Sequence, residues 1–108
     1  MAQPGDIFPR ELKARMDRGH SPLILDVREM EEVALAPFPH AVHIPMGEIP
    51  SRLADLDPER EVVVVCHHGI RSAQVAGYLS SIGFEMVFNL TGGIDAWSVS
   101  VDPTVARY

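Results

Sequence analysis

The sequence contains one cysteine, Cys66, so a disulfide bond within the chain is excluded. It has no apolar run close to the roughly 20 residues that a membrane-spanning helix needs, and it begins without the pattern of a secretory signal. Basic residues are scarce: nine Lys and Arg stand against fifteen Asp and Glu, which gives a formal net charge of −6. An acidic surface binds nucleic acid and anionic membranes poorly. We therefore expect a cytoplasmic protein that binds neither.

The composition is that of one folded domain covering residues 1–108. Hydrophobic residues make up 46% of the chain and charged residues 22%, which disfavours disorder. Apolar runs alternate with helical patterns, and this alternation is typical of α/β proteins with a largely parallel sheet. Residues 62–65 are four consecutive valines, as expected of a central strand that is covered on both faces.

The periodicity of the apolar residues and the positions of Pro and Gly define the expected elements. The last residues up to Tyr108 show little periodicity. Expected helices cover residues 10–18, 29–35, 47–56, 71–82 and 93–99, and expected strands cover 23–27, 41–44, 62–65 and a segment within 84–90.

Cys66 directly follows the valine strand and precedes the helix expected from Arg71. In open α/β sheets, ligands bind at this carboxyl edge of the strands. The first turn of a helix has N–H groups without intrahelical partners, and these attract negative charge. Gly69 can adopt positive φ and turn N–H groups inward, while Arg71 adds positive charge. We therefore predict a partly exposed, nucleophilic thiolate at Cys66 and prefer it to an inert, buried cysteine.

Three separated segments carry motifs: Leu-Asp-Val-Arg-Glu at 25–29 with Glu32 after it, Cys-His-His-Gly-Ile-Arg-Ser at 66–72, and Asn-Leu-Thr-Gly-Gly-Ile-Asp-Ala-Trp at 89–97. Together they resemble the single-domain rhodaneses, a family of sulfurtransferases, from about Pro9 to the end of the chain. The turn at 36–41 departs from the Gly-His-Ile-Pro-Gly-Ala that this family often carries, so we assign it no catalytic role. The chain end also resembles rhodanese domains fused to enzymes that adenylylate sulfur-carrier proteins.

The resemblance implies a three-layer α/β/α fold around a five-stranded, mostly parallel sheet. It also implies sulfur transfer in two steps, from thiosulfate or a persulfide-bearing protein to the protein, and then to cyanide, a thiol or a sulfur-carrier protein. No metal or organic cofactor is needed for this reaction. Cys66 would be the nucleophile, and the substrate-binding cradle would be formed by His67, His68, Gly69, Ile70, Arg71 and Ser72.

Two further groups of residues have structural interpretations. Asp26 and Arg28 lie at the end of a predicted strand, and we interpret them as an orienting ion pair that holds neighbouring loops. Asp26→Ala should therefore reduce stability more than sulfur transfer. We interpret the acidic run at 28–32 as a solvated helix face, and Gly92 and Gly93 as a tight turn.

Metal binding is the first alternative to weigh. Cys66 and the histidines at 40, 43, 67 and 68 could be combined into a cluster, but adjacent ligands in one tight loop seldom all face one ion. We therefore expect no metal site.

Three other functions remain open. A rhodanese-fold phosphatase or arsenate reductase would use a related loop, but phosphatases have five residues between Cys and Arg, whereas four separate Cys66 from Arg71. A purely binding or regulatory module is disfavoured by the presence of Cys66. A redox sensor would lack a second cysteine to resolve a sulfenic acid within the chain.

Overall fold

The structure, a computed structural model, describes residues 3–108. A five-stranded sheet with the strand order β1-β5-β4-β2-β3 forms its centre. Each neighbouring pair of strands is parallel, so the expected, mostly parallel sheet is fully parallel. The strands are β1 (Gly5–Ile7), β2 (Leu23–Asp26), β3 (Val42–His43), β4 (Val62–Val65) and β5 (Val87–Leu90).

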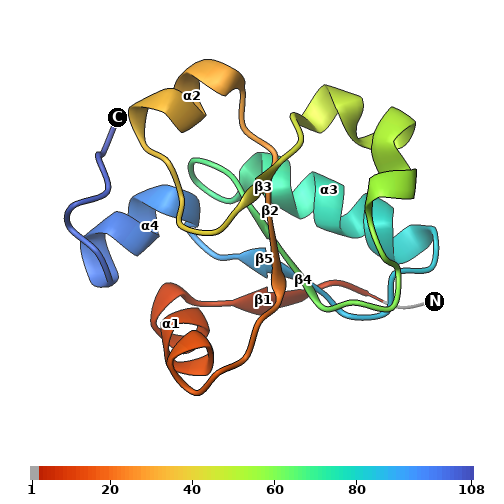
Figure 1. The fold of residues 1–108 in the computed structure, drawn as a ribbon, viewed down its shortest axis with the longest axis horizontal. Coiled ribbons are helices and arrows are strands. Elements are labelled where there is room, and N and C mark those ends of the chain that lie inside the picture. Colours follow the sequence, from red (N-terminus) through yellow and green to blue (C-terminus); the bar gives the residue numbers. More distant parts are fainter. Residues whose placement is uncertain (1–2) are drawn as a thin grey trace.

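Helices cover both faces of this sheet, which confirms the three-layer α/β/α arrangement. Figure 1 shows α1 and α4 on one side and α3 with η1 on the other. Among residues 3–108, no helix is both long and apolar enough to cross a membrane. The helices are α1 (Pro9–Asp17), α2 (Met30–Leu35), the 3₁₀ helix η1 (Met46–Asp55), α3 (Ile70–Ser81) and α4 (Gly93–Ser100).

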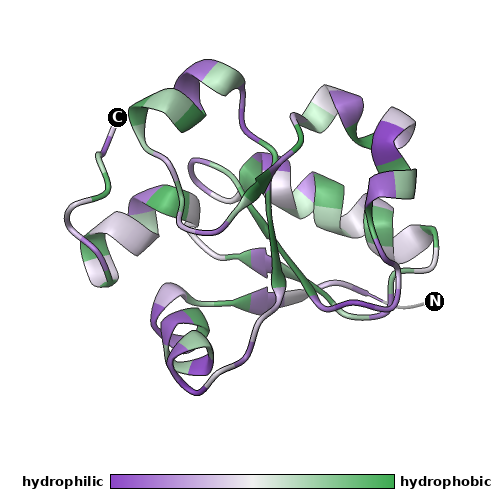
Figure 2. Cartoon of the chain, in the orientation of Figure 1, coloured by the Kyte–Doolittle hydropathy of each residue, from purple (hydrophilic) through white to green (hydrophobic). Residues whose placement is uncertain are grey.

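The valine strand β4 lies between two hydrophobic layers, one on each face of the sheet. Val62 and Val64 pack into the layer below α3, whereas Val63 and Val65 pack into the layer that contains Trp97 of α4. All four valines are fully buried, as expected of a parallel strand covered on both faces. In Figure 2, β4 is green, hydrophobic, along its length, whereas the helices carry both green and purple segments.

Two elements differ from the sequence-based expectation. Strand β1 was not expected, because three residues between prolines show no periodicity; it is nevertheless paired with β5 along one edge of the sheet. The segment expected to be an α-helix over 47–56 is a 3₁₀ helix with a kink at Arg52. Pro50 lies inside it, and proline has no N–H with which to continue an α-helical hydrogen-bond ladder.

The turn that departs from the family pattern has an unusual backbone. His40 has φ 58°, in the left-handed region that glycine adopts most readily. The pattern that this turn resembles has glycine at the same position, so this chain accepts a less favourable residue there.

Candidate active site

The topology brings three strand ends together at one edge of the sheet. In the strand order, β4 lies between β5 and β2, and the three strands are parallel. The residues that follow them are therefore neighbours: Cys66 after β4, the segment 26–28 at the end of β2, and 91–93 after β5. Ligands bind at such an edge in open α/β sheets.

The sulfur of Cys66 lies inside a turn of backbone N–H groups. The N–H of Gly69 donates to Cys66 Sγ at 3.1 Å, and the N–H of Ser72 donates to it at 3.3 Å. Gly69 is the N-cap of α3 with φ 95°, which points its N–H back toward the sulfur. The first turn of α3 also leaves the N–H groups of Ile70 and Arg71 without intrahelical partners. This arrangement favours negative charge on the sulfur.

The expected partial exposure of Cys66 is wrong. The residue is 1% exposed and belongs to the core layer below α3. Its side chain points inward, into the core layer that also contains Val64 and Val75. A donor must therefore approach the sulfur through the loop.

Asn89 is a site residue that the sequence analysis missed. Its Oδ1 accepts a hydrogen bond from Ser72 Oγ at 2.5 Å, and its Nδ2 donates to the carbonyl of Gly69 at 3.2 Å. Ser72 Oγ also lies 3.2 Å from Cys66 Sγ. The sequence feature that could have indicated this role is a single amide side chain, Asn89, within the otherwise apolar strand β5.

The Gly92–Gly93 turn contacts the Cys66 loop directly. The N–H of Ile94 donates to the Cys66 carbonyl at 2.8 Å, and that of Asp95 donates to the His67 carbonyl at 3.0 Å. Gly93 has φ 63°, and a Cβ there would lie 2.4 Å from the Cys66 oxygen. The interpretation of Gly92 and Gly93 as a tight turn was correct. The atoms that Gly93 approaches closely belong to the backbone of the Cys66 loop.

Arg71 is paired with Glu32, so Glu32 departs from the interpretation of the acidic run as a solvated face, whereas residues 29–31 are exposed as expected. Arg71 Nη1 lies 2.7 Å from Glu32 Oε2, and Nη2 lies 2.8 Å from Oε1. These bonds lower the pKa of Glu32 to about 2, and the pair raises the pKa of Arg71. Glu32 also closes a capping box with Glu29 at the start of α2. The charge of Arg71 is therefore already compensated within the protein.

The depressed pKa of Glu32 predicts a defined acid sensitivity. The folded protein keeps the carboxylate ionised to about pH 2, whereas the unfolded chain takes up the proton near its usual pKa of 4.5. The stabilisation is therefore present above about pH 4.5 and is lost as pH falls toward 2. After allowance for solvent screening, we expect Glu32→Gln to cost about 2 kcal/mol at pH 7.

Urea unfolding of both proteins at several pH values tests this prediction. The difference in unfolding free energy between them should shrink through that window, because the other carboxylates are common to both. A difference that stays constant from pH 7 to pH 2 would contradict it.

Asp26 and Arg28 form a fully buried ion pair beside the loop. Arg28 Nη2 lies 2.8 Å from Asp26 Oδ2, and both side chains are 0% exposed. Burial alone would lower the pKa of Arg28, but its hydrogen bonds to Asp26 and Tyr108 raise it. Arg28 also donates to the carbonyls of Ala36 at 2.7 Å and Glu32 at 3.2 Å. The pair thereby ties the end of β2 to α2.

Tyr108 is the second site residue that the sequence analysis missed. Its hydroxyl accepts from Arg28 Nη1 at 3.0 Å and donates to Glu32 Oε1 at 3.1 Å. Its ring stacks on His67, with centroids 3.8 Å apart and 11° between the planes. Burial raises the pKa of Tyr108, so the phenol keeps the hydrogen that it donates. Tyr108 therefore links three parts of the site.

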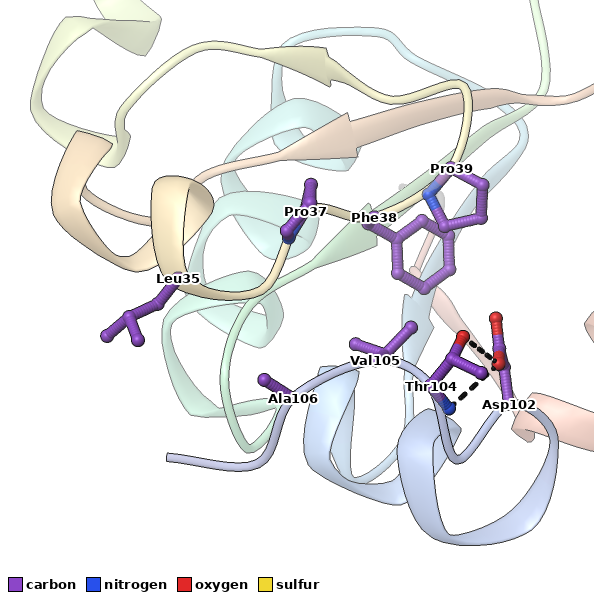
Figure 3. Close-up of a pocket in the computed structure, with 8 residues that line it drawn as sticks. All are labelled: Leu35, Pro37, Phe38, Pro39, Asp102, Thr104, Val105 and Ala106. Atoms are coloured by element: carbon purple, nitrogen blue, oxygen red, sulfur yellow. Dashed lines mark hydrogen bonds between the residues drawn. The ribbon is translucent and has the colours of Figure 1, made fainter.

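The preceding segment 102–106 holds Tyr108 in place. Figure 3 shows this segment facing the turn 35–39 across a surface pocket, with Phe38 and Val105 pointing toward each other. Val105 is buried, and its carbonyl accepts from Ser98 Oγ of α4 at 2.6 Å. No residue of the Cys66 loop lines this pocket. The contacts of Val105 at the pocket anchor the end of the chain.

The two histidines of the loop differ in burial: His68 is exposed, whereas His67 is partly buried between His68 and Tyr108. His67 stacks on His68 with centroids 3.8 Å apart. Burial and the neighbouring His68 lower the pKa of His67, so it is neutral at pH 7. Ligand atoms of His67, His68 and Asp95 lie within 4.8 Å of one another. The Asp95 carboxylate is already bound by Arg107, at 2.8 Å.

Comparison with known proteins agrees with the fold. The family model for the rhodanese-like domain matches residues 8–100. YtwF of Bacillus subtilis (strain 168) is 41% identical over 91% of this chain and 94% of its own, and a sulfurtransferase of Allochromatium vinosum is 37% identical over 94% of both. A crystal structure of a rhodanese-like domain protein from Staphylococcus aureus matches with a TM-score of 0.81, at 36% identity over 86% of this chain and 90% of that one. This chain belongs to the rhodanese-like family of sulfurtransferases.

Proposed function

We propose that this protein transfers a sulfane sulfur by carrying it as a persulfide on Cys66. The observation that supports the proposal most directly is the pair of N–H groups from Gly69 and Ser72, at 3.1 and 3.3 Å from Cys66 Sγ. They stabilise the thiolate before the reaction, and the free N–H groups at the start of α3 are available to the second sulfur. Thiolate is the nucleophilic form of cysteine.

The reaction takes two steps. In the first, the Cys66 thiolate attacks the outer sulfur of a donor, a new S–S bond forms, and the old S–S bond breaks with its electron pair on the leaving group. Sulfite leaves from thiosulfate, and a thiolate leaves from a thiol persulfide. In the second step, cyanide, a thiol or a sulfur-carrier protein attacks the outer sulfur, and the Cys66 thiolate is released.

The intact mass of the protein after incubation with a sulfur donor tests this function. We expect a gain of one sulfur atom that cyanide removes, and no gain in Cys66→Ser, because a serine hydroxyl is not ionised near neutral pH. The substitution replaces one atom of a buried side chain, so thermal unfolding should show that the variant is folded. The chain has no other cysteine, so any added sulfur reports on this residue.

Two donors should be used, thiosulfate and cysteine persulfide. Failure of both to add sulfur, with Cys66 still open to alkylation, would overturn the proposal. Efficient hydrolysis of an aryl phosphate by the same protein would then favour the phosphatase alternative.

A further inference from the structure

The site contains guanidinium groups, yet each of them has a carboxylate partner. Arg71 pairs with Glu32, and Arg28 pairs with Asp26. At the start of α4, Arg107 pairs with Asp95, whose N–H holds the Cys66 loop. His67 and His68 also lie on that side, and His67 is neutral at pH 7 because burial and the neighbouring His68 lower its pKa. The loop therefore offers N–H groups to an anion but little net positive charge.

Glu32 is held in its position from three sides. Its two oxygens accept the two Arg71 bonds at 2.7 and 2.8 Å. Oε1 also accepts the Tyr108 hydroxyl at 3.1 Å, and Oε2 accepts the backbone N–H of Glu29 at 3.0 Å. An incoming anion must compete with this carboxylate for Arg71 and cannot simply displace it. The net charge of −6 on the whole chain adds a repulsive field at longer range.

We infer that Glu32 makes this site select thiol persulfides over the thiosulfate dianion. This inference rests on the proposed function and names the donor class that the site prefers. A persulfide R–S–SH reacts in its protonated form: Cys66–S⁻ and R–S–SH give Cys66–S–SH and R–S⁻. Thiosulfate instead brings two negative charges and leaves as sulfite with two: Cys66–S⁻ and S–SO₃²⁻ give Cys66–S–S⁻ and SO₃²⁻. Only the second reaction must bring a dianion to a loop whose Arg71 is already bound by the Glu32 carboxylate.

The measurement is the rate of sulfur loading on Cys66, followed by intact mass, with thiosulfate and with cysteine persulfide as the two donors. Glu32→Gln keeps the shape and the acceptor oxygen of the side chain and removes its charge. We expect it to raise the ratio of the thiosulfate rate constant to the persulfide rate constant about tenfold, since one charge is removed next to a dianion in a partly buried site. A change that slows both reactions by the same factor cancels in this ratio.

Two further variants complete the design. Glu31→Gln makes the same change of net charge on an exposed neighbour, and we expect it to change the ratio less than twofold. Tyr108→Phe removes one of the bonds that hold Glu32, and it should shift the ratio in the same direction by a smaller factor.

The outcomes separate the two proposals. A tenfold change in the ratio for Glu32→Gln but not for Glu31→Gln supports the inference. Sulfur loading with an unchanged ratio, or with equal changes in both variants, overturns the inference and leaves the proposed function standing. No loading from either donor in the unaltered protein overturns both.

Discussion

Replacing Arg28 with alanine is expected to lower the free energy of unfolding by about 3–5 kcal/mol, which is the usual cost of breaking a buried ion pair from one side. The Asp26 carboxylate would remain 0% exposed without its partner. The carbonyl of Ala36 and the hydroxyl of Tyr108 would also lose a donor. Small domains have only about 5–15 kcal/mol of stability, so this one contact can decide whether the chain folds.

A control substitution separates the effect of breaking a buried ion pair from the effect of losing an arginine side chain. Arg15→Ala removes an arginine of α1 that pairs with the exposed Glu11 and lies over the Phe88 ring, and we expect a cost of about 1–2 kcal/mol. Urea unfolding followed by circular dichroism gives both values. Equal effects of Arg15→Ala and Arg28→Ala would show that the buried pair has no special contribution. Asp26→Ala should destabilise as Arg28→Ala does, because it leaves a buried guanidinium unpaired.

The sequence allowed the central fold to be predicted because it is encoded locally. Four valines in succession define β4, and a helix pattern follows within a few residues, so the position of Cys66 between them could be derived. The role of Gly69 in turning N–H groups toward the sulfur could be predicted in the same way, because this glycine lies where the helix begins. Its φ of 95° and its bond to the sulfur agree with that reasoning.

The missed features are contacts between residues far apart in the chain. Glu32 and Arg71 are 39 positions apart, and Arg28 and Tyr108 are 80 positions apart. Local periodicity reports only which face of an element is apolar, so Glu32 looked like a solvated residue of a short helix. Tyr108 lies in a segment without periodicity, and its place depends on Val105 packing into the core. Only the folded chain brings such pairs together.

The burial of Cys66 was misjudged for a related reason. The sequence placed the residue in a loop, and loops are usually exposed. In the structure, however, the Cys66 side chain packs into the core layer below α3, and the turn at 92–93 closes against the backbone of the loop. Exposure is therefore decided by packing between elements that are far apart in the chain.

The contact between Gly93 and the loop leads to the second large expected effect. Gly93→Ala should slow the loading of sulfur on Cys66 about a hundredfold, the typical consequence of displacing reacting groups by about 1 Å. A Cβ at position 93 would lie 2.4 Å from the Cys66 oxygen and 2.5 Å from the His67 oxygen. Both atoms are backbone, so the loop must move away and the bond from the Ile94 N–H at 2.8 Å must break.

Gly77→Ala is the matched control for this substitution. Gly77 lies within α3, and an added Cβ there meets nothing within 4 Å. Alanine is more favourable than glycine inside a helix by up to about 1 kcal/mol, so this variant should be slightly more stable and load sulfur at the unaltered rate. If Gly93→Ala loaded sulfur as fast as Gly77→Ala, the Gly92–Gly93 turn would have no part in placing the N–H cradle. A slow Gly93→Ala that still unfolds cooperatively would instead locate the defect in the geometry of the loop around Cys66.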